Sequence, residues 1–213
     1  MNIQNLFWYH YFALAGLLVC LITFVFHFLK LIRLGFPEDF SNKIGDTKAS
    51  IVYSFTGALN PAKKESAYLH LPTYTAGLFY HFGTFLTAFI FFSTLLGVFY
   101  NGFIIKWAFI IFLCLSALCG IGILIKRISL KKIRSFSTID DYVSNALVTL
   151  FQIMTALLLL SDKFSPLYFI CSGILLIYMP VGKLKHALYF FAARYQLGLF
   201  YGWRGVWPIR RSS

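Results

Sequence analysis

The sequence predicts an all-α integral membrane protein, a bundle of five transmembrane helices. Hydrophobic residues make up 59% of the 213 residues and charged residues only 12%, whereas a soluble domain is about one quarter charged. The mean hydropathy is +0.75. A spanning helix needs roughly 20 mostly apolar residues. Five segments meet this requirement: 6–29, 74–99, 102–125, 142–161 and 165–187.

The first segment, MNIQNLFWYHYFALAGLLVCLITFVFHFLK, is predicted to be a spanning helix that is retained. No basic n-region precedes it, and its apolar stretch is too long for a signal peptide. His10 lies in the aromatic run FWYHYF, where an interfacial polar residue of an aromatic belt is expected. His27, near the other end, is expected to face the bundle, to bind a quinone or to snorkel.

The links between the segments predict the orientation. The second and fourth links, YNG and SDKFSP, are tight turns, whereas the links 30–73 and 126–141 are longer and basic. By the positive-inside rule the long links and the tail 188–213 are cytoplasmic, and the N-terminus is outside. Only Lys106 and Lys163 fall on the outer side. The cytoplasmic cations are Lys30, Arg33, Lys43, Lys48, Lys63, Lys64, Lys126, Arg127, Lys131, Lys132, Arg134, Lys183, Lys185, Arg194, Arg204, Arg210 and Arg211.

Because the basic residues gather on one side, the formal charge of +12 is interpreted first as a topology signal and second as a possible docking surface. No nucleic-acid partner is predicted. The whole chain, 1–213, is predicted to be one membrane domain in the cytoplasmic membrane. The link 30–73 is long enough for a short helix or two. The tail is typical of a helix that leaves the bilayer and of a segment that lies in contact with membrane lipid.

Metal and transport chemistry find little support in the sequence. The four cysteines form no C-x-x-C, no Cys/His cluster and no C-x-x-C-H haem-attachment motif. No acidic residue falls within the five segments, although cation-coupled transporters usually carry a buried carboxylate. No internal repeat is evident, which also disfavours a transporter.

Two histidines fall at matching depths in separate spans. His81 is 19 residues from Tyr100 at the outer end of the second span, and His186 is 21 residues from Ser165 at the outer end of the fifth. At about 1.5 Å per residue, both imidazoles lie at nearly the same depth, toward the inside. Facing histidines on separate helices are one way in which a bundle holds a haem. The alternative is two structural histidines bonded to carbonyl groups across helices.

The surroundings of these histidines suit a haem. Gly77 and Gly83 flank His81 and allow a flat macrocycle to approach the backbone, and Pro180 is expected to kink the fifth span before His186. His70, just before the helix that Pro72 opens, is the reserve ligand. The candidates for binding the propionates are Lys183, Lys185 and Arg194.

Four motifs, in this order, resemble the gamma subunit of respiratory nitrate reductase. These are LFYHFG around His81, GILIKRISLKKIRSFSTIDDYV in the third link, MPVGKLKH ending at His186, and ARYQL after it. The family is a membrane cytochrome b with five spans, an outer N-terminus and an inner C-terminus; related cytochromes serve heterodisulfide-reductase-like and sulfite-reductase-associated complexes. The resemblance covers spans two to five and implies that His81 and His186 are axial ligands of haem iron.

The chain departs from the family at the second haem. Family members usually carry it nearer the outer face, on a second histidine of each of the same two helices. The matching positions are about Phe91 and Tyr168, and neither is a ligand of this kind. The resemblance therefore implies one non-covalent haem b. The long first link departs as well and suggests a different soluble partner.

The predicted function is that of an electron-transfer subunit of a respiratory oxidoreductase rather than a complete enzyme. Haem b would pass electrons between membrane quinone and a cytoplasmic iron–sulfur or flavin partner. His27, Gln152 and Tyr195 are the candidate polar contacts for the quinone. The alternatives are a haem-free membrane anchor or structural subunit, which would be colourless, and a small transporter.

Overall fold

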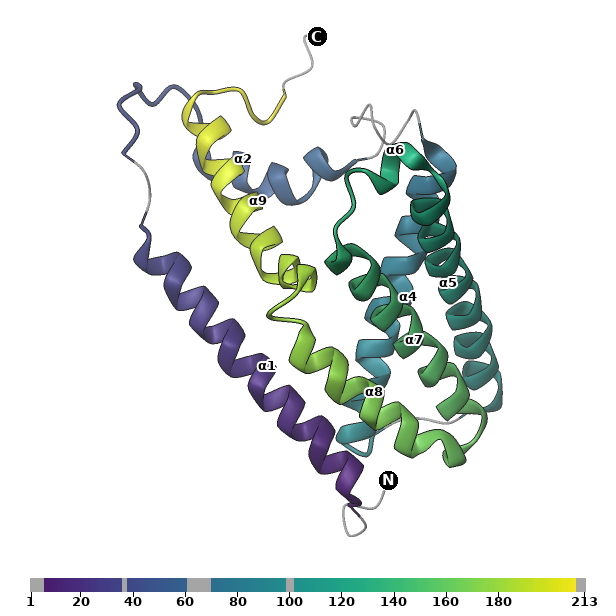
Figure 1. Cartoon of the computed structure of the whole chain (residues 1–213). Helices are drawn as coiled ribbons and strands as arrows, with labels where there is room; N and C mark the ends of the chain where they lie inside the picture. The colour runs from purple at the N-terminus through teal and green to yellow at the C-terminus, as the bar shows by residue number, and fades with distance from the viewer. Residues whose placement is uncertain (1–5, 36–37, 61–69, 99–101, 210–213) are drawn as a thin grey trace. The chain divides into compact units, whose positions relative to one another are not determined.

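The computed structural model describes residues 6–35, 38–60, 70–98 and 102–209. All regular secondary structure in these ranges is helical (Figure 1), so the predicted all-α class is confirmed. The chain forms two compact units. Unit 1 comprises Met1–Thr23 and Pro72–Leu184, and unit 2 comprises Phe24–Leu71 and Lys185–Ser213.

Among the described residues, four helices are long and apolar enough to cross a membrane. A fifth crossing is reached if the bent pair Asp162–Tyr178 and Lys183–Trp203 is counted as one span. These helices are compatible with a multi-pass membrane protein. The four are α1 (Trp8–Arg33), α4 (Leu71–Leu95), α5 (Phe103–Ser129) and α7 (Ile139–Leu160).

The segment 165–187, predicted as one kinked span, is divided in the structure. Helix α8 (Ser165–Tyr178) ends two residues before Pro180, and α9 (His186–Trp203) begins after a 3₁₀ turn at Lys183–Lys185. Proline has no N–H to donate and clashes with the preceding turn, so a helix ends more easily there than it bends. Because α8 has 14 residues, it rises only about 21 Å. The depth of His186 counted along a continuous helix therefore does not apply.

Unit 1 is built around α7, which packs against α5 and α8 (Figure 1). Its main core holds aromatic rings from α4, α7 and α8, among them Phe91, Phe151, Tyr168 and Phe169. A short helix, α6 (Lys131–Arg134), connects α5 to α7. The first half of α1 lies on α8, where a Cβ atom at Gly16 would come within 2.8 Å of the Gly173 carbonyl oxygen. Small residues are what allow such close helix packing in membrane proteins.

Unit 2 is built around helix α2 (Thr47–Phe55), which packs along α9. The Asp46 carboxylate caps α2 by accepting hydrogen bonds from the N–H groups of Lys48 and Ala49. A Cβ atom at Gly198 would lie 2.5 Å from the Ile51 Cα, and one at Gly202 would lie 2.6 Å from the Ser50 Cβ. The two backbones are therefore in direct contact, and α9 needs glycine at both positions.

Residues on either side of α2 and α9 hold the ends of this pair together. The Trp203 Nε1 donates to the Ser41 carbonyl oxygen at 2.7 Å, and the Ile44 N–H donates to the Trp203 carbonyl oxygen at 2.9 Å. The Arg204 guanidinium meets the Asp39 carboxylate at 2.7 and 3.1 Å. The predicted short helix of the first link and the predicted helix of the tail thus exist, and they form one structure.

Several predictions fall on residues outside the described ranges. They concern Tyr100, which served as a depth reference, and four of the cations predicted to be cytoplasmic, Lys63, Lys64, Arg210 and Arg211.

Candidate functional site

His81 lies near the middle of α4 in unit 1, and its side chain is exposed from that unit. The neighbouring positions on the helix, Leu78, Phe82 and Phe85, are exposed and apolar. One turn before His81, a Cβ atom built on Gly77 would meet no atom within 4 Å. The His81 imidazole therefore lies on an apolar surface of α4. One turn before it, at Gly77, no other atom covers the helix backbone.

Gly83 does not belong to this surface. A Cβ atom there would lie 1.9 Å from the Ser116 Oγ and 3.2 Å from the Gln152 Nε2, so Gly83 serves the packing of α4 on α5 and α7. The prediction that both glycines open a space beside His81 is therefore wrong for Gly83, while Gly77 fits it. A glycine in a helix does not itself reveal whether a ligand or a neighbouring helix approaches it.

His186 is the first residue of α9 in unit 2 and is exposed. Lys185, directly before it, is the N-cap residue of the helix. His70, the reserve ligand, lies in unit 2 one residue before α4 and is exposed as well. His81 belongs to the other unit, so each imidazole has its own surroundings, and the pairing of His81 with His186 stays a prediction.

The positions that match the family's outer haem ligands are filled by packed rings. Phe91 is 3% exposed and Tyr168 is fully buried, and their ring centroids are 6.4 Å apart. Tyr168 also stacks on Phe151 at 5.7 Å and meets Phe169 edge-on at 5.0 Å. In the described part of unit 1, aromatic side chains therefore occupy the place where the resemblance would put a second haem.

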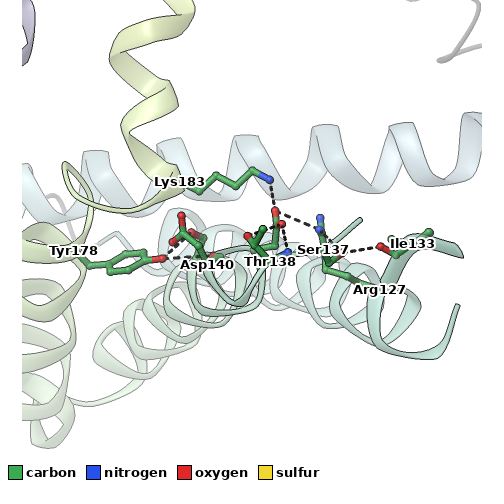
Figure 2. A network of polar contacts seen from close by, with 9 residues as sticks. Arg127, Ile133, Ser137, Thr138, Asp140, Tyr178 and Lys183 are labelled. Carbon is green, nitrogen blue, oxygen red and sulfur yellow. Dashed lines mark hydrogen bonds and ion pairs between the residues drawn. The ribbon is translucent and has the colours of Figure 1, made fainter. Parts of the chain in front are cut away.

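A charged cluster at the start of α7 centres on Asp141, whose side chain is only 4% exposed. Its Oδ1 atom pairs with Lys183 and, at 3.3 Å, with the Arg127 Nη1. Its Oδ2 atom accepts hydrogen bonds from the N–H and hydroxyl of Thr138 at 2.9 and 3.1 Å. Dashed lines in Figure 2 mark these contacts of Lys183, Thr138 and Arg127, and the hydrogen bond from Arg127 to the Ser137 hydroxyl. Both carboxylate oxygens are thus engaged with donors on three segments of the chain.

This cluster bears on two predictions. Helix α7 begins at Ile139, three residues before the predicted span, so Asp140 and Asp141 lie inside its first turn although the spans were expected to hold no acid. In addition, the Lys183 ammonium is bound to Asp141, so it contributes to the packing of unit 1, and its contact with a propionate stays a prediction. Lys185 stays a candidate in unit 2.

Gln152 is also part of the internal packing of unit 1. Its side chain is fully buried; the Oε1 atom accepts from the Ser116 hydroxyl at 2.9 Å, and the Nε2 atom donates to the Tyr80 carbonyl oxygen and the Thr84 hydroxyl, both at 3.1 Å. The amide thereby joins α4, α5 and α7. The structure thus gives Gln152 a packing role, and its contact with a quinone stays a prediction.

The remaining candidates lie in unit 2. His27 is half-buried on α1, and its Nδ1 atom is 3.3 Å from the Tyr189 hydroxyl of α9. Arg194 lies over the Phe190 ring at 5.5 Å, and its carbonyl oxygen accepts from the Ser54 hydroxyl. Tyr195 is exposed. The structure therefore brings His27 together with a tyrosine that the sequence did not single out.

His10 has a structural role at the start of α1. It is 3% exposed, its Nδ1 atom accepts a hydrogen bond from the Phe7 N–H at 3.1 Å, and its ring lies 4.3 Å from that of Phe169. It differs from the expected interfacial residue in being enclosed by unit 1.

Two signals for the missed residues were present in the sequence. Thr138 followed three residues later by Asp141 is the pattern of a helix N-terminus, and Gly198 followed four residues later by Gly202 is a small-residue helix-packing motif. Neither signal names the partner, because Lys183 and α2 are far away in the chain. Tyr189 carries no local signal of its own.

Comparison with known proteins finds no matching family model, no matching curated protein and no matching solved structure. Among the described residues, no three His, Cys, Asp or Glu side chains form a group able to hold a metal ion. A haem requires only two axial side chains, so this finding bears on metal-ion sites and not on haem.

Proposed function

We propose that the chain is a membrane subunit of a respiratory oxidoreductase complex that binds one haem b, with His81 and His186 as its axial ligands. It would lie in the cytoplasmic membrane with its N-terminus outside, and transfer electrons between membrane quinone and a cytoplasmic iron–sulfur or flavin partner. The resemblance to the nitrate reductase gamma family suggests this role.

The observation that carries the proposal is the surface around His81. An imidazole near the middle of an apolar helix is a functional candidate by default, because ionisable groups within membranes are costly. Here it is exposed from unit 1 among Leu78, Phe82 and Phe85, beside the uncovered backbone at Gly77. Neutral imidazole nitrogen is a suitable axial donor, and apolar aromatic surroundings suit a porphyrin face. The surroundings of His81 therefore suit one face of the proposed haem.

Other features of the chain agree with a single haem. The aromatic packing of Phe91 with Tyr168 leaves His81 and His186 as the proposed ligand pair and argues against a second haem on the same two segments. A haem with two histidine ligands supplies one-electron transfer, while the protein supplies its position and its electrostatic surroundings. Lys185 and Arg194 are the proposed propionate contacts, and His27 and Tyr195 are the proposed quinone contacts.

A reduced-minus-oxidised spectrum with a haem count tests the proposal. We expect one haem b per wild-type chain purified from cells supplied with haem, and its loss in both His81→Ala and His186→Ala. His81→Met is expected to retain haem with a raised potential, because a methionine ligand favours the reduced iron. His70→Ala is the matched control, an exposed histidine near the same helix, and should keep its haem.

The outcomes separate the alternatives. A wild-type protein that is colourless under these conditions supports the anchoring subunit. Haem that survives His81→Ala but is lost in His70→Ala makes His70 the ligand. Haem that survives either His81→Ala or His186→Ala with an unchanged spectrum excludes that residue as a ligand.

A further inference from the structure

The chain between α8 and α9 is attached to the start of α7 on both of its sides. Tyr178, the last residue of α8, places its hydroxyl 3.2 Å from that of Ser144 and 3.4 Å from the Asp140 carbonyl oxygen. Lys183, the first residue of the following 3₁₀ turn, binds Asp141. The four residues 179–182 therefore lie between two attachments to one helix end; Figure 2 labels the two attached residues, Tyr178 and Lys183.

Residues 179–182 form a compact turn. Pro180 is fully buried, and the N–H groups of Val181 and Gly182 both donate to the Tyr178 carbonyl oxygen, at 3.1 and 2.9 Å. A Cβ atom at Gly182 would lie 2.4 Å from the Tyr178 ring, so a larger residue there would have to displace the ring whose hydroxyl contacts Ser144. The turn is thus defined by packing and hydrogen bonds up to Lys183.

Asp141 is the residue on which the second attachment depends. It is the carboxylate that meets Lys183, and its position is set by Thr138 on its own helix and by Arg127 of α5. A nearly buried carboxylate with four donors has one favourable placement, because each lost donor leaves an unsatisfied charge. The Lys183 ammonium therefore has a fixed acceptor, and His186 follows three residues later.

We propose that Asp141 is a positioning residue for His186, acting through Lys183 to fix the turn from which α9 starts. This inference rests on the proposed function, in which His186 binds haem iron. Asp141 does not touch the haem in this proposal; it fixes the turn that precedes His186. We call its ion pair with Lys183 the clamp.

Two variants break the clamp from opposite sides. Asp141→Asn keeps the shape of the side chain and removes its charge, and Lys183→Gln removes the ammonium without touching the start of α7. Lys131→Gln and Lys132→Gln each remove one exposed lysine of α6 in the same unit and leave the four donors to Asp141 in place. The last two variants are the controls.

Hydrogen exchange of residues 181–186 in haem-free protein is the first measurement. We expect at least tenfold faster exchange there in Asp141→Asn and in Lys183→Gln, because local opening no longer breaks the ion pair. The double variant should exceed the larger single effect by little, since both changes remove one interaction. Lys131→Gln and Lys132→Gln should stay within about twofold of wild type.

The second measurement is made on protein loaded with haem. Electron paramagnetic resonance of the oxidised low-spin iron depends on how the two imidazole planes are oriented. We expect Asp141→Asn and Lys183→Gln to retain haem with shifted resonance positions and a shifted midpoint potential, and Lys131→Gln to leave the resonance positions unchanged.

Unchanged exchange in Asp141→Asn would overturn the clamp itself. Faster exchange with unchanged resonances would overturn the role toward His186, because the turn would loosen without moving the ligand. A wild-type protein without haem would overturn the proposed function and with it the positioning of a ligand, while the exchange data would still decide whether Asp141 fixes the turn.

Discussion

The two units bring their helices together by different means. In unit 1 a buried amide and hydroxyl groups link α4, α5 and α7, as the contacts of Gln152 with Ser116 and Tyr80 show. In unit 2 the helices α2 and α9 touch backbone to backbone at Gly198 and Gly202. Close glycine contacts also occur in unit 1, at Gly83 and Gly16, and a hydrogen bond from the Ser54 hydroxyl to the Arg194 carbonyl oxygen also joins the helices of unit 2. The difference is that a buried polar side chain links three helices in unit 1, whereas the close contacts between α2 and α9 in unit 2 are those at the glycines of α9.

The largest expected effect is the loss of the α2–α9 contact in Gly202→Leu. The added side chain would meet the Ser50 Cβ at 2.6 Å and the Thr47 Cα at 2.8 Å, and backbone atoms cannot move aside as a flexible side chain can. We expect unit 2 to be destabilised by about 3 kcal/mol. Hydrogen exchange of α2 measures the loss.

Ala193→Leu is the matched control for this variant, because Ala193 is exposed on α9. Its α2 amides should exchange as in the wild type. Equal exchange in Gly202→Leu and Ala193→Leu would mean that shape does not hold the pair together.

A smaller effect is expected in unit 1 from Gln152→Leu. The substitution keeps the volume but leaves the Ser116 hydroxyl and the Tyr80 carbonyl oxygen without this partner inside the helices. Thermal unfolding in detergent should show a destabilisation of about 1–2 kcal/mol. Ser116→Ala breaks the same network, so the double variant should fall short of the sum of the two single effects. A fully additive result would show that the two side chains act separately.

The pair of His27 and Tyr189 tests whether the second half of α1 depends on α9. Tyr189→Phe removes the hydroxyl that lies 3.3 Å from the His27 Nδ1 and should cost about 0.5–1 kcal/mol. The measurement is hydrogen exchange in residues 24–33. Tyr11→Phe, at an exposed tyrosine of α1, should leave the exchange of residues 24–33 unchanged. Equal exchange in the two variants would show that the Tyr189 hydroxyl does not stabilise this part of α1.

The smallest effect concerns the pH dependence of unit 2. Hydrogen bonds from the Ser41 hydroxyl and N–H, and then the Arg204 guanidinium, hold the pKa of Asp39 below its usual value. A carboxyl group with a lowered pKa in the folded state stabilises that state above the unfolded pKa, and this contribution is lost as pH falls through the folded pKa. Proteolysis of the tail at decreasing pH should therefore accelerate in the wild type. In Asp39→Asn this increase in the rate of proteolysis at low pH should be absent. If the increase is retained, another group causes it.

The apolar runs predicted most of the helices but not where the last of them breaks. Composition alone locates α1, α4, α5 and α7, because a membrane requires long uncharged segments. The same rule overlooked the end of α8, where MPVG carries the local signal in Pro180 and Gly182. The pattern of apolar residues does not indicate such a break, because the segment is apolar on both sides of it.

The contacts of the candidate residues were less predictable than their positions. His81 was located in α4 from the sequence, but its spacing could not show that Gly83 faces Ser116 while Gly77 faces open space. Lys183 was assigned to a propionate because it lies near His186 in the chain, whereas it binds Asp141. A lysine has many carboxylates within reach of its long side chain, and only the fold determines which one it meets.

Unit 2 joins residues 24–71 to residues 185–213, and this division has a consequence for biosynthesis. Helix α2 is synthesised more than a hundred residues before α9, so unit 2 cannot close until α9 has been translated. In a chain that stops before Arg194, Ser50 and Ser54 of α2 would lack the residues of α9 that contact them in the complete unit.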